Sequence, residues 1–461
     1  REKVPFKPIR PDEVLMHSCG PTVHEIPHIG NFRRYVVSDM IRRYLEYQSF
    51  RVRHVMNIID LADRSIRGAE QAGVDLKTFT GKGTAAFLDG LTRLNIRRDD
   101  EYPRASDHFE GMAKLVERLV QKGYAYEKLK SVYFDISKLA DYGKLSNVDL
   151  HRAVPGRTVD QDDYEKDSPV DFTLLKRSTL SELKSGVYFK TRWGNVRPSW
   201  HLECAATAMQ YLGETFDIHA SGADVIFPHC ENVLAIGRGA TGKAPANYWI
   251  HTELVMVDGK KMSRSLNNAV TLEELEARGY HGREIRFFFL SSHYRKPLNF
   301  SYGALETARN TVKKLDGFVQ RLIRFTPGEG YADTDQLLYD VKQGFCNAMD
   351  DDFNISGALA ALFELVNRVG PPLAKGLFSR QERDRILEHL KGLDAVLGIM
   401  NFEEETIGGE ARRLLEERQT LRKQGRWEEA DGIRKRLLEM GVEISDTPGG
   451  PIWRLKPPVS N

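Results

Sequence analysis

The start of the chain alternates an apolar strand, a helix and a second apolar strand, and this order constrains the fold most. Residues 14–18 and 51–59 are apolar and partly β-branched, whereas residues 33–48 repeat apolar side chains at helical spacing. A strand, a helix and a strand in about 45 residues predict a βαβ unit and a parallel sheet. The alternation resumes later, with helices expected over 199–212 and 232–240 and strands over 216–219 and 249–257. We therefore predict an α/β fold that is interrupted in the middle.

The interruption and the second half of the chain have other patterns. Residues 131–136 and 186–191 resemble strands around an acidic stretch at 160–171, which we expect to be solvated surface. Helical periodicity dominates from residue 302 to residue 424, and two short strands close the chain around a Pro-Gly-Gly turn. The predicted domains are the first half of the α/β domain (1–123), an insertion (124–195), the second half (196–300), a helical stem and bundle (301–400), and a small C-terminal α/β domain (401–461).

Composition excludes several classes of protein. Lys and Arg number 67 and Asp and Glu number 65, so the net charge of +2 gives no support for nucleic-acid or membrane binding by bulk charge. The 41% hydrophobic and 29% charged residues indicate a globular chain. No apolar run is long enough to span a bilayer, and we expect no secretory signal and a cytoplasmic location. The four cysteines are too few for a disulfide framework, so an important thiol should be a ligand or a core residue.

A first candidate motif, His28-Ile29-Gly30-Asn31, lies between the first strand and the first helix. Backbone N–H groups at a helix start favour an anion such as phosphate, and Gly30 allows a ligand to approach the backbone closely. His28 and Asn31 can donate hydrogen bonds to charge that develops on a phosphate. Four residues alone are also compatible with an ordinary turn.

A second candidate motif, Lys261-Met262-Ser263-Arg264-Ser265, follows the expected strand 249–257. Cations beside small hydroxyl residues in a loop can clamp a polyphosphate, although a solvated loop would have the same composition. The two motifs, in this order and about 230 residues apart, resemble the HIGH and KMSKS motifs of class I aminoacyl-tRNA synthetases. That resemblance implies a Rossmann-type catalytic domain with an insertion, followed by a helical bundle and an anticodon-binding domain.

Further motifs narrow the resemblance to the cysteinyl-tRNA synthetases. The segments that are similar to this family are Cys19-Gly20-Pro21-Thr22-Val23, Trp200-His201-Leu202-Glu203-Cys204, Phe216-Asp217-Ile218-His219, Phe227-Pro228-His229, Ala430-Asp431-Gly432-Ile433-Arg434, Asp446-Thr447-Pro448 and Trp453-Arg454. They extend from residue 18 to residue 454, which is nearly the whole chain. The family implies ATP with Mg²⁺, L-cysteine and tRNA(Cys) as partners, and we expect a monomer without a membrane contact.

The resemblance implies a zinc ion in the amino-acid pocket, where it binds the substrate thiolate. The matching ligand positions are Cys19, Cys204 and His229, but Val233 stands where the family has a fourth ligand, a Glu. Two thiolates, a neutral imidazole and Zn²⁺ sum to zero charge and leave one tetrahedral position for a substrate thiolate. Cys230 adjoins His229 and should point elsewhere, so we do not expect it to replace the Glu.

The resemblance also assigns the remaining site residues. It implies ATP binding by Gly20, Thr22, His28, Gly30, Asn31, Asp224, Lys261, Ser263 and Arg264, with His28, Asn31, Lys261 and Arg264 as the catalytic set. It implies amino-acid binding by Cys19, Ile59, Trp200 and His219. Here Ile59 replaces the family's usual Thr, Ala220-Ser221-Gly222 replaces a glycine-rich run, and Arg264 replaces the second Lys of the KMSKS motif. These departures fit neutral drift, altered substrate choice or lost acylation.

The C-terminal segment is the candidate RNA-binding region. Residues 412–436 contain nine Lys or Arg and five Asp or Glu, an excess of four that on charge alone is typical of a solvated helix. Trp427 could instead stack on an unpaired base. The resemblance implies tRNA binding through Arg422, Trp427, Asp431, Arg434 and Asp446.

We therefore predict a cysteine–tRNA ligase, which would activate L-cysteine with ATP and transfer it to the 3′ end of tRNA(Cys). The alternatives are a divergent paralogue that activates another amino acid or loads a different acceptor, and a catalytically weak tRNA-binding protein. Ile59 and Val233 motivate the first alternative, whereas the intact motifs at His28 and Lys261 count against the second.

Overall fold

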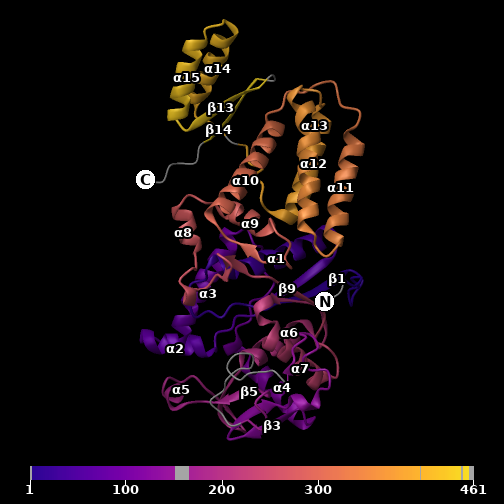
Figure 1. Cartoon of the computed structure of the whole chain (residues 1–461), viewed down its shortest axis with the longest axis vertical. Coiled ribbons are helices and arrows are strands. Elements are labelled where there is room, and N and C mark those ends of the chain that lie inside the picture. The colour runs from indigo at the N-terminus through magenta and orange to yellow at the C-terminus, as the bar shows by residue number, and fades with distance from the viewer. Residues whose placement is uncertain (1–2, 151–165, 405, 448–449, 456–461) are drawn as a thin grey trace. The chain divides into compact units, whose positions relative to one another are not determined.

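The computed structural model describes residues 3–150, 166–404, 406–447 and 450–455. These residues form two compact units (Figure 1). The first unit comprises Arg1–Leu272 and Tyr294–Phe300, and the second comprises Glu273–His293 and Ser301–Asn461. In the described ranges no helix has both the length and the apolarity that crossing a membrane requires.

A parallel sheet of four strands forms the centre of the first unit. Its order is β2-β1-β8-β9, with β1 at Glu13–Ser18, β2 at Arg51–Met56, β8 at Phe216–Gly222 and β9 at Ala246–Thr252. Every neighbouring pair is parallel. The two middle strands, β1 and β8, are buried along their whole length, as expected for a parallel sheet covered on both faces. The α/β prediction is confirmed.

The strand order places a crevice between β1 and β8. Helix α1 (Ile29–Tyr47) leads from β1 to β2 on one side, and helix α7 (Glu231–Thr241) leads from β8 to β9 on the other. The two connections thus leave neighbouring strands in opposite directions. In such sheets the carboxyl ends of these strands border the ligand-binding crevice. The loops that follow β1, β2, β8 and β9 all begin at this edge.

Several predicted element bounds were wrong, and two of these differences bear on the site. Helix α1 begins at Ile29, not at residue 33, because His28 is the residue that caps it in an extended conformation. The expected strand 249–257 is two strands, β9 and β10 (Val255–Val257), which belong to different sheets. Glu253 and Leu254 lie between these two strands, and the guanidinium of Arg33 donates to both of their carbonyls.

A hairpin carries the second motif. Strand β10 pairs antiparallel with β11 (Lys260–Lys261) and parallel with β12 (Leu298–Asn299). Asp258 and Gly259 join β10 to β11, and both have positive φ angles, 50° and 75°. A two-residue Asp-Gly turn with two positive φ angles fits the twist of a hairpin. The turn therefore sets the position of Lys261 opposite Met256.

The region expected as an insertion contains an antiparallel sheet of order β3-β4-β5-β7-β6. Its strands are β3 (Ala125–Lys128), β4 (Ser131–Phe134), β5 (Phe172–Arg177), β6 (Phe189–Thr191) and β7 (Gly194–Pro198), with the short helix α5 at Leu180–Lys184. The acidic stretch lies partly outside the described residues, up to residue 165. Asp167 is exposed, but Asp171 is buried and accepts hydrogen bonds from Tyr126 and Ile136. The expectation of solvated surface was therefore wrong for Asp171.

Helices complete both units. In the first unit they include α2 (Asp63–Ala72), α3 (Leu76–Arg93), α4 (Phe109–Gln121) and α6 (Trp200–Leu212). The second unit has α8 (Leu272–Ala277), α9 (Gly282–Leu290) and a bundle of α10 (Tyr302–Ile323), α11 (Thr334–Asp350), α12 (Ile355–Ala374) and α13 (Arg380–Leu397) (Figure 1). At its C-terminal end α14 (Gly409–Lys423), α15 (Trp427–Glu439) and the hairpin β13 (Val442–Thr447) and β14 (Gly450–Leu455) share a small apolar core.

Candidate active site

A cavity of about 520 Å³ lies at the carboxyl edge of the parallel sheet. All nine residues predicted to bind ATP line it, namely Gly20, Thr22, His28, Gly30, Asn31, Asp224, Lys261, Ser263 and Arg264. Three of the four residues predicted to bind the amino acid, Cys19, Ile59 and Trp200, line the same cavity. The structure thus brings the two distant motifs and the candidate amino-acid pocket together in one site.

The start of helix α1 forms one wall of the cavity. The backbone N–H of His28 donates to Asn31 Oδ1 at 3.0 Å, and the N–H of Ile29 donates to the Val270 carbonyl at 2.8 Å. Burial lowers the pKa of His28 to about 4, and the charges of Arg264 and Lys261 add to this effect. The imidazole is therefore neutral at pH 7 and can offer one N–H to an anion.

The hairpin loop supplies cations opposite His28. Lys261 Nζ donates to Asp224 at 2.5 Å, and Arg264 donates to the Ile26 carbonyl at 2.8 Å. Burial opposes ionisation of Asp224, but the nearby Lys261 charge holds its pKa below the usual value. Two cations and a neutral imidazole face a common space, which suits an anionic ligand.

A buried cluster of two cysteines and a histidine adjoins the cavity. The ligand atoms of Cys19, Cys204 and His229 lie within 4.8 Å of one another, and Cys19 Sγ is 3.4 Å from His229 Nε2. A hydrogen bond from Cys204 lowers the pKa of Cys19 well below its usual value, against burial, and His229 acts in the same direction. Cys19 is the member of the cluster that lines the cavity. This donor set fits a metal ion with an open position toward the cavity.

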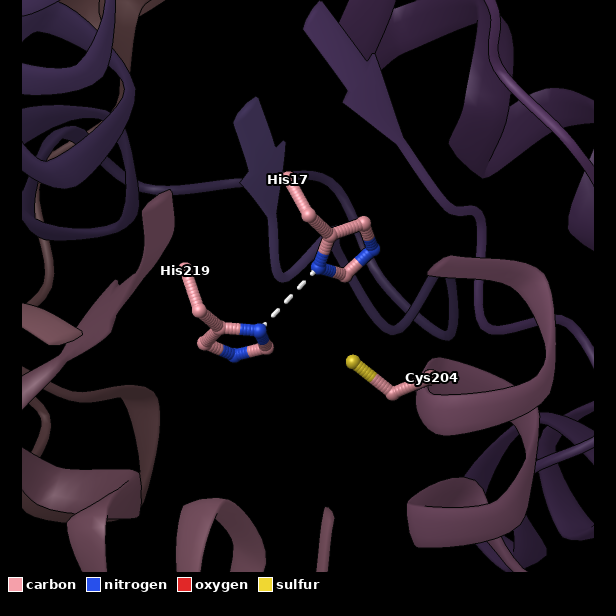
Figure 2. Close-up of side chains that lie close together, drawn as sticks. All are labelled: His17, Cys204 and His219. Carbon is pink, nitrogen blue, oxygen red and sulfur yellow. Dashed lines mark hydrogen bonds between the residues drawn. The ribbon is translucent and has the colours of Figure 1, made fainter. Parts of the chain in front are cut away.

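Cys204 also belongs to a second group of possible ligands, with His17 and His219 (Figure 2). The Nδ1 atoms of His17 and His219 lie 3.3 Å apart and are hydrogen-bonded. None of these three residues lines the cavity. His219, which was predicted to bind the amino acid, therefore lies behind the cavity wall, where its ring also contacts Trp249.

Two residues that depart from the family pattern, Ile59 and Val233, are buried near the cluster. Val233 is fully buried in an apolar core that includes Cys19, Cys204 and Ile59. Within the described part of the chain no carboxylate joins the Cys19 cluster. Cys230 Sγ lies 3.2 Å from Ser221 Oγ and is not part of the cluster, so the prediction that it points elsewhere is confirmed.

Several lining residues were missed at the sequence level, among them Arg33 and Arg34. Arg34 donates to the Gly20 carbonyl at 3.2 Å, and the charges of Cys19 and Asp224 act on it. Both arginines lie one helical turn after the Gly30-Asn31 pair, so the 3.6-residue repeat of a helix could have identified them.

The five residues predicted to bind tRNA cluster in the C-terminal part of the second unit. Asp446 accepts two hydrogen bonds from the buried Arg418, each 2.8 Å long, and a third from Arg422. Arg422 also lies 5.2 Å above the ring of Trp427, whose surface is 58% exposed. Asp431 and Arg434 are exposed nearby on α15. Trp427 is thus largely exposed, whereas the Asp446 carboxylate accepts hydrogen bonds from two arginines.

The crevice of the parallel sheet has residues 28–31 on one side and residues 261–265 on the other. This arrangement defines a class I tRNA synthetase fold. The solved structures agree, since the chain matches Mycobacterium tuberculosis methionyl-tRNA synthetase in complex with methionyl-adenylate at a TM-score of 0.60 and 17% identity, over 84% of this chain and 90% of that one. A leucyl-tRNA synthetase of Agrobacterium radiobacter matches at a TM-score of 0.61 and 12% identity, over 86% and 85%.

The particular family follows from the sequence comparisons. Residues 5–310 match the model of the class I (C) tRNA synthetase catalytic domain, residues 344–401 match the DALR domain, and residues 405–454 match the cysteinyl-tRNA ligase anticodon binding domain. Cysteine–tRNA ligases of Methanosarcina mazei and Thermococcus onnurineus are 41% and 38% identical, over 98% of this chain and 96% and 97% of theirs. The chain belongs to the cysteinyl-tRNA ligase family, and the comparisons support none of the alternative functions.

Proposed function

We propose that the chain joins L-cysteine to tRNA(Cys) in two steps within the cavity at the sheet edge. The observation that carries this proposal is the position of Cys19, which lines the cavity beside the nucleotide-binding motifs and belongs to the Cys19–Cys204–His229 cluster. One cavity can thus hold ATP and a thiol-bearing amino acid next to each other.

In the first step a carboxylate oxygen of cysteine attacks the α-phosphorus of ATP, and the bond to pyrophosphate breaks. His28 and Asn31 would donate hydrogen bonds to the phosphate oxygens from one side, while Lys261 and Arg264 would neutralise the departing pyrophosphate from the other. Mg²⁺ would accompany the nucleotide. Catalysis here rests on positioning and charge stabilisation, so no general base is assigned.

Cys19, Cys204 and His229 would hold a zinc ion. Their two sulfur atoms and one nitrogen fit its preferred ligands. Bound zinc would supply a soft Lewis acid that prefers a thiolate to a hydroxyl group. That preference separates cysteine from serine, which the shape of a pocket does poorly.

In the second step a ribose hydroxyl at the 3′ end of tRNA attacks the cysteinyl carbonyl, and AMP leaves. The C-terminal domain would bind the anticodon loop, with the exposed Trp427 stacking on a base and Arg422, Asp431 and Arg434 around it. A monomeric state and a cytoplasmic location stay predictions.

Charging of tRNA tests the proposal. Purified protein, a tRNA(Cys) transcript, ATP and labelled cysteine should give cysteinyl-tRNA, and a tRNA(Ser) transcript should serve as the matched control. Strong amino-acid activation without any transfer to tRNA(Cys) would contradict the proposed acceptor.

A further inference from the structure

The histidine of the candidate metal cluster is held by two consecutive residues of helix α6. The ring of Trp200 stacks on the ring of His229, with centroids 3.9 Å apart and planes 11° apart. The ring of His201 is tilted by 33° to the same imidazole, with centroids 5.2 Å apart, and its Nδ1 atom is 3.0 Å from His229 Nδ1. Trp200 thus fixes the plane of the His229 ring, and His201 fixes its rotation within that plane.

Helix α6 supplies these contacts from its first turn. Ser199 caps the helix by accepting a hydrogen bond from the Leu202 N–H. Cys204, a member of the cluster, follows His201 by three residues and lies on the same helical face. His201 and His229 are buried, with exposures of 1% and 0%. A ligand and the groups that orient another ligand therefore move as one rigid element.

The proton positions follow from the geometry. His229 Nε2 faces Cys19 Sγ at 3.4 Å, so this nitrogen is the one that can bind a metal ion. A metal-bound nitrogen carries no proton, and the single proton of the neutral ring then lies on Nδ1. His229 Nδ1–H must therefore donate to His201 Nδ1, and His201 must accept with that nitrogen.

We propose that His201 is a positioning residue for the metal site, which orients His229 and fixes its tautomer by accepting the hydrogen bond from Nδ1–H. This inference rests on the proposed function, because it presumes that the Cys19–Cys204–His229 cluster holds zinc. Outer partners of metal-bound histidines typically contribute 10- to 100-fold in metal affinity. Because Val233 cannot act as a fourth ligand, only three protein ligands remain. The zinc affinity should therefore depend more strongly on the orientation of each of them.

The test is a zinc titration of the full chain in competition with a chromophoric chelator. His201→Leu removes the acceptor at similar volume and should weaken zinc binding about 10- to 100-fold. His201→Asn keeps an acceptor near the position of Nδ1 and should restore most of the affinity. The visible absorption of the cobalt(II)-substituted protein gives a second readout, since His201→Leu should change the bands that report ligand geometry around the metal.

The control is His108→Leu, which also removes a histidine with two hydrogen bonds, to the Arg104 carbonyl and the Tyr211 hydroxyl, but touches no residue of the cluster. It should leave zinc affinity unchanged. Equal zinc affinity in the parent and in His201→Leu would overturn the role of His201 while leaving the zinc site intact. A parent chain that binds no zinc would overturn both, and an Asn variant no better than the Leu variant would refute the hydrogen bond as the cause.

Discussion

Gly30 lies where one added methyl group would meet both motifs of the active site. A Cβ atom at this position would be 3.0 Å from Cε1 and Nδ1 of His28 and 3.3 Å from Met262 Sδ. These distances are shorter than the roughly 3.5–4.0 Å at which heavy atoms attract most favourably. In Gly30→Ala the His28 ring or the hairpin loop must therefore give way by a few tenths of an ångström.

The size of the effect follows from this displacement. A misplacement of about 1 Å at a reacting centre can cost roughly 100-fold in rate, so a shift of about half that size should cost roughly 10-fold. Alanine is also a better helix former than glycine by about 1 kcal/mol, which offsets part of the steric cost in the folded state. Gly30→Ala should thus lose about 10-fold in adenylate formation while its free energy of unfolding stays within about 1 kcal/mol of the parent.

Amino-acid-dependent ATP–pyrophosphate exchange and thermal unfolding measure the two quantities. Gly81→Ala, in helix α3, is the matched control, because a Cβ at Gly81 would meet nothing within 4 Å apart from its chain neighbours and the backbone of its own helix. The control should keep full exchange activity and equal or higher stability. Full activity in Gly30→Ala, or a loss of stability that accounts for the lost rate, would refute the steric reasoning.

Three further predictions concern tRNA binding, stability and pH. Trp427→Ala should weaken tRNA binding about 5- to 100-fold in a filter assay without changing Tm, because stacking on an exposed aromatic ring contributes about 1–3 kcal/mol per base. Arg418→Ala should destabilise the C-terminal domain by roughly 1.5–3 kcal/mol in urea unfolding, because it removes a buried side chain that donates two charge-assisted hydrogen bonds to Asp446, while Arg422 still pairs with that carboxylate. Because the pKa of His28 is about 4, the exchange rate should decrease on the acid side of its pH profile near pH 4, and not near pH 6.5, the usual pKa of histidine. Since that pKa is depressed in the folded state, the stability that His28 contributes should be complete above about pH 6.5 and be lost as the pH falls toward 4.

Much of the architecture could be predicted because it depends on local patterns. Apolar strands separated by helical repeats identified the parallel sheet, and the Asp258-Gly259 pair matches the turn of the hairpin that carries Lys261. The break between β9 and β10 could not be predicted, since the residues between the strands bond to partners distant in sequence, such as Arg33, 220 residues before Glu253. Asp171 was misjudged for the same reason, because its burial depends on Tyr126 from another strand.

In the candidate site, too, local motifs were predictable and contacts between residues distant in sequence were not. Residue types and family motifs identified all nine residues of the nucleotide set, which line the cavity, but they missed other lining residues such as Arg33 and Arg34. The contacts among buried side chains were not predictable, because His201 meets His229 only when helix α6 packs beside the segment before α7. His219 was placed in the amino-acid pocket by its motif, whereas in the structure it does not line the cavity and contacts His17 and Trp249.

Pyrophosphate exchange with cysteine and with serine, on protein whose zinc content is assayed in the same sample, tests the central claim most directly. The Cys19–Cys204–His229 cluster should make cysteine the preferred substrate by far more than the roughly 100-fold that pocket shape alone provides. Removal of zinc should abolish exchange with cysteine. Comparable exchange with serine, or unchanged exchange with cysteine after zinc is removed, would contradict the account.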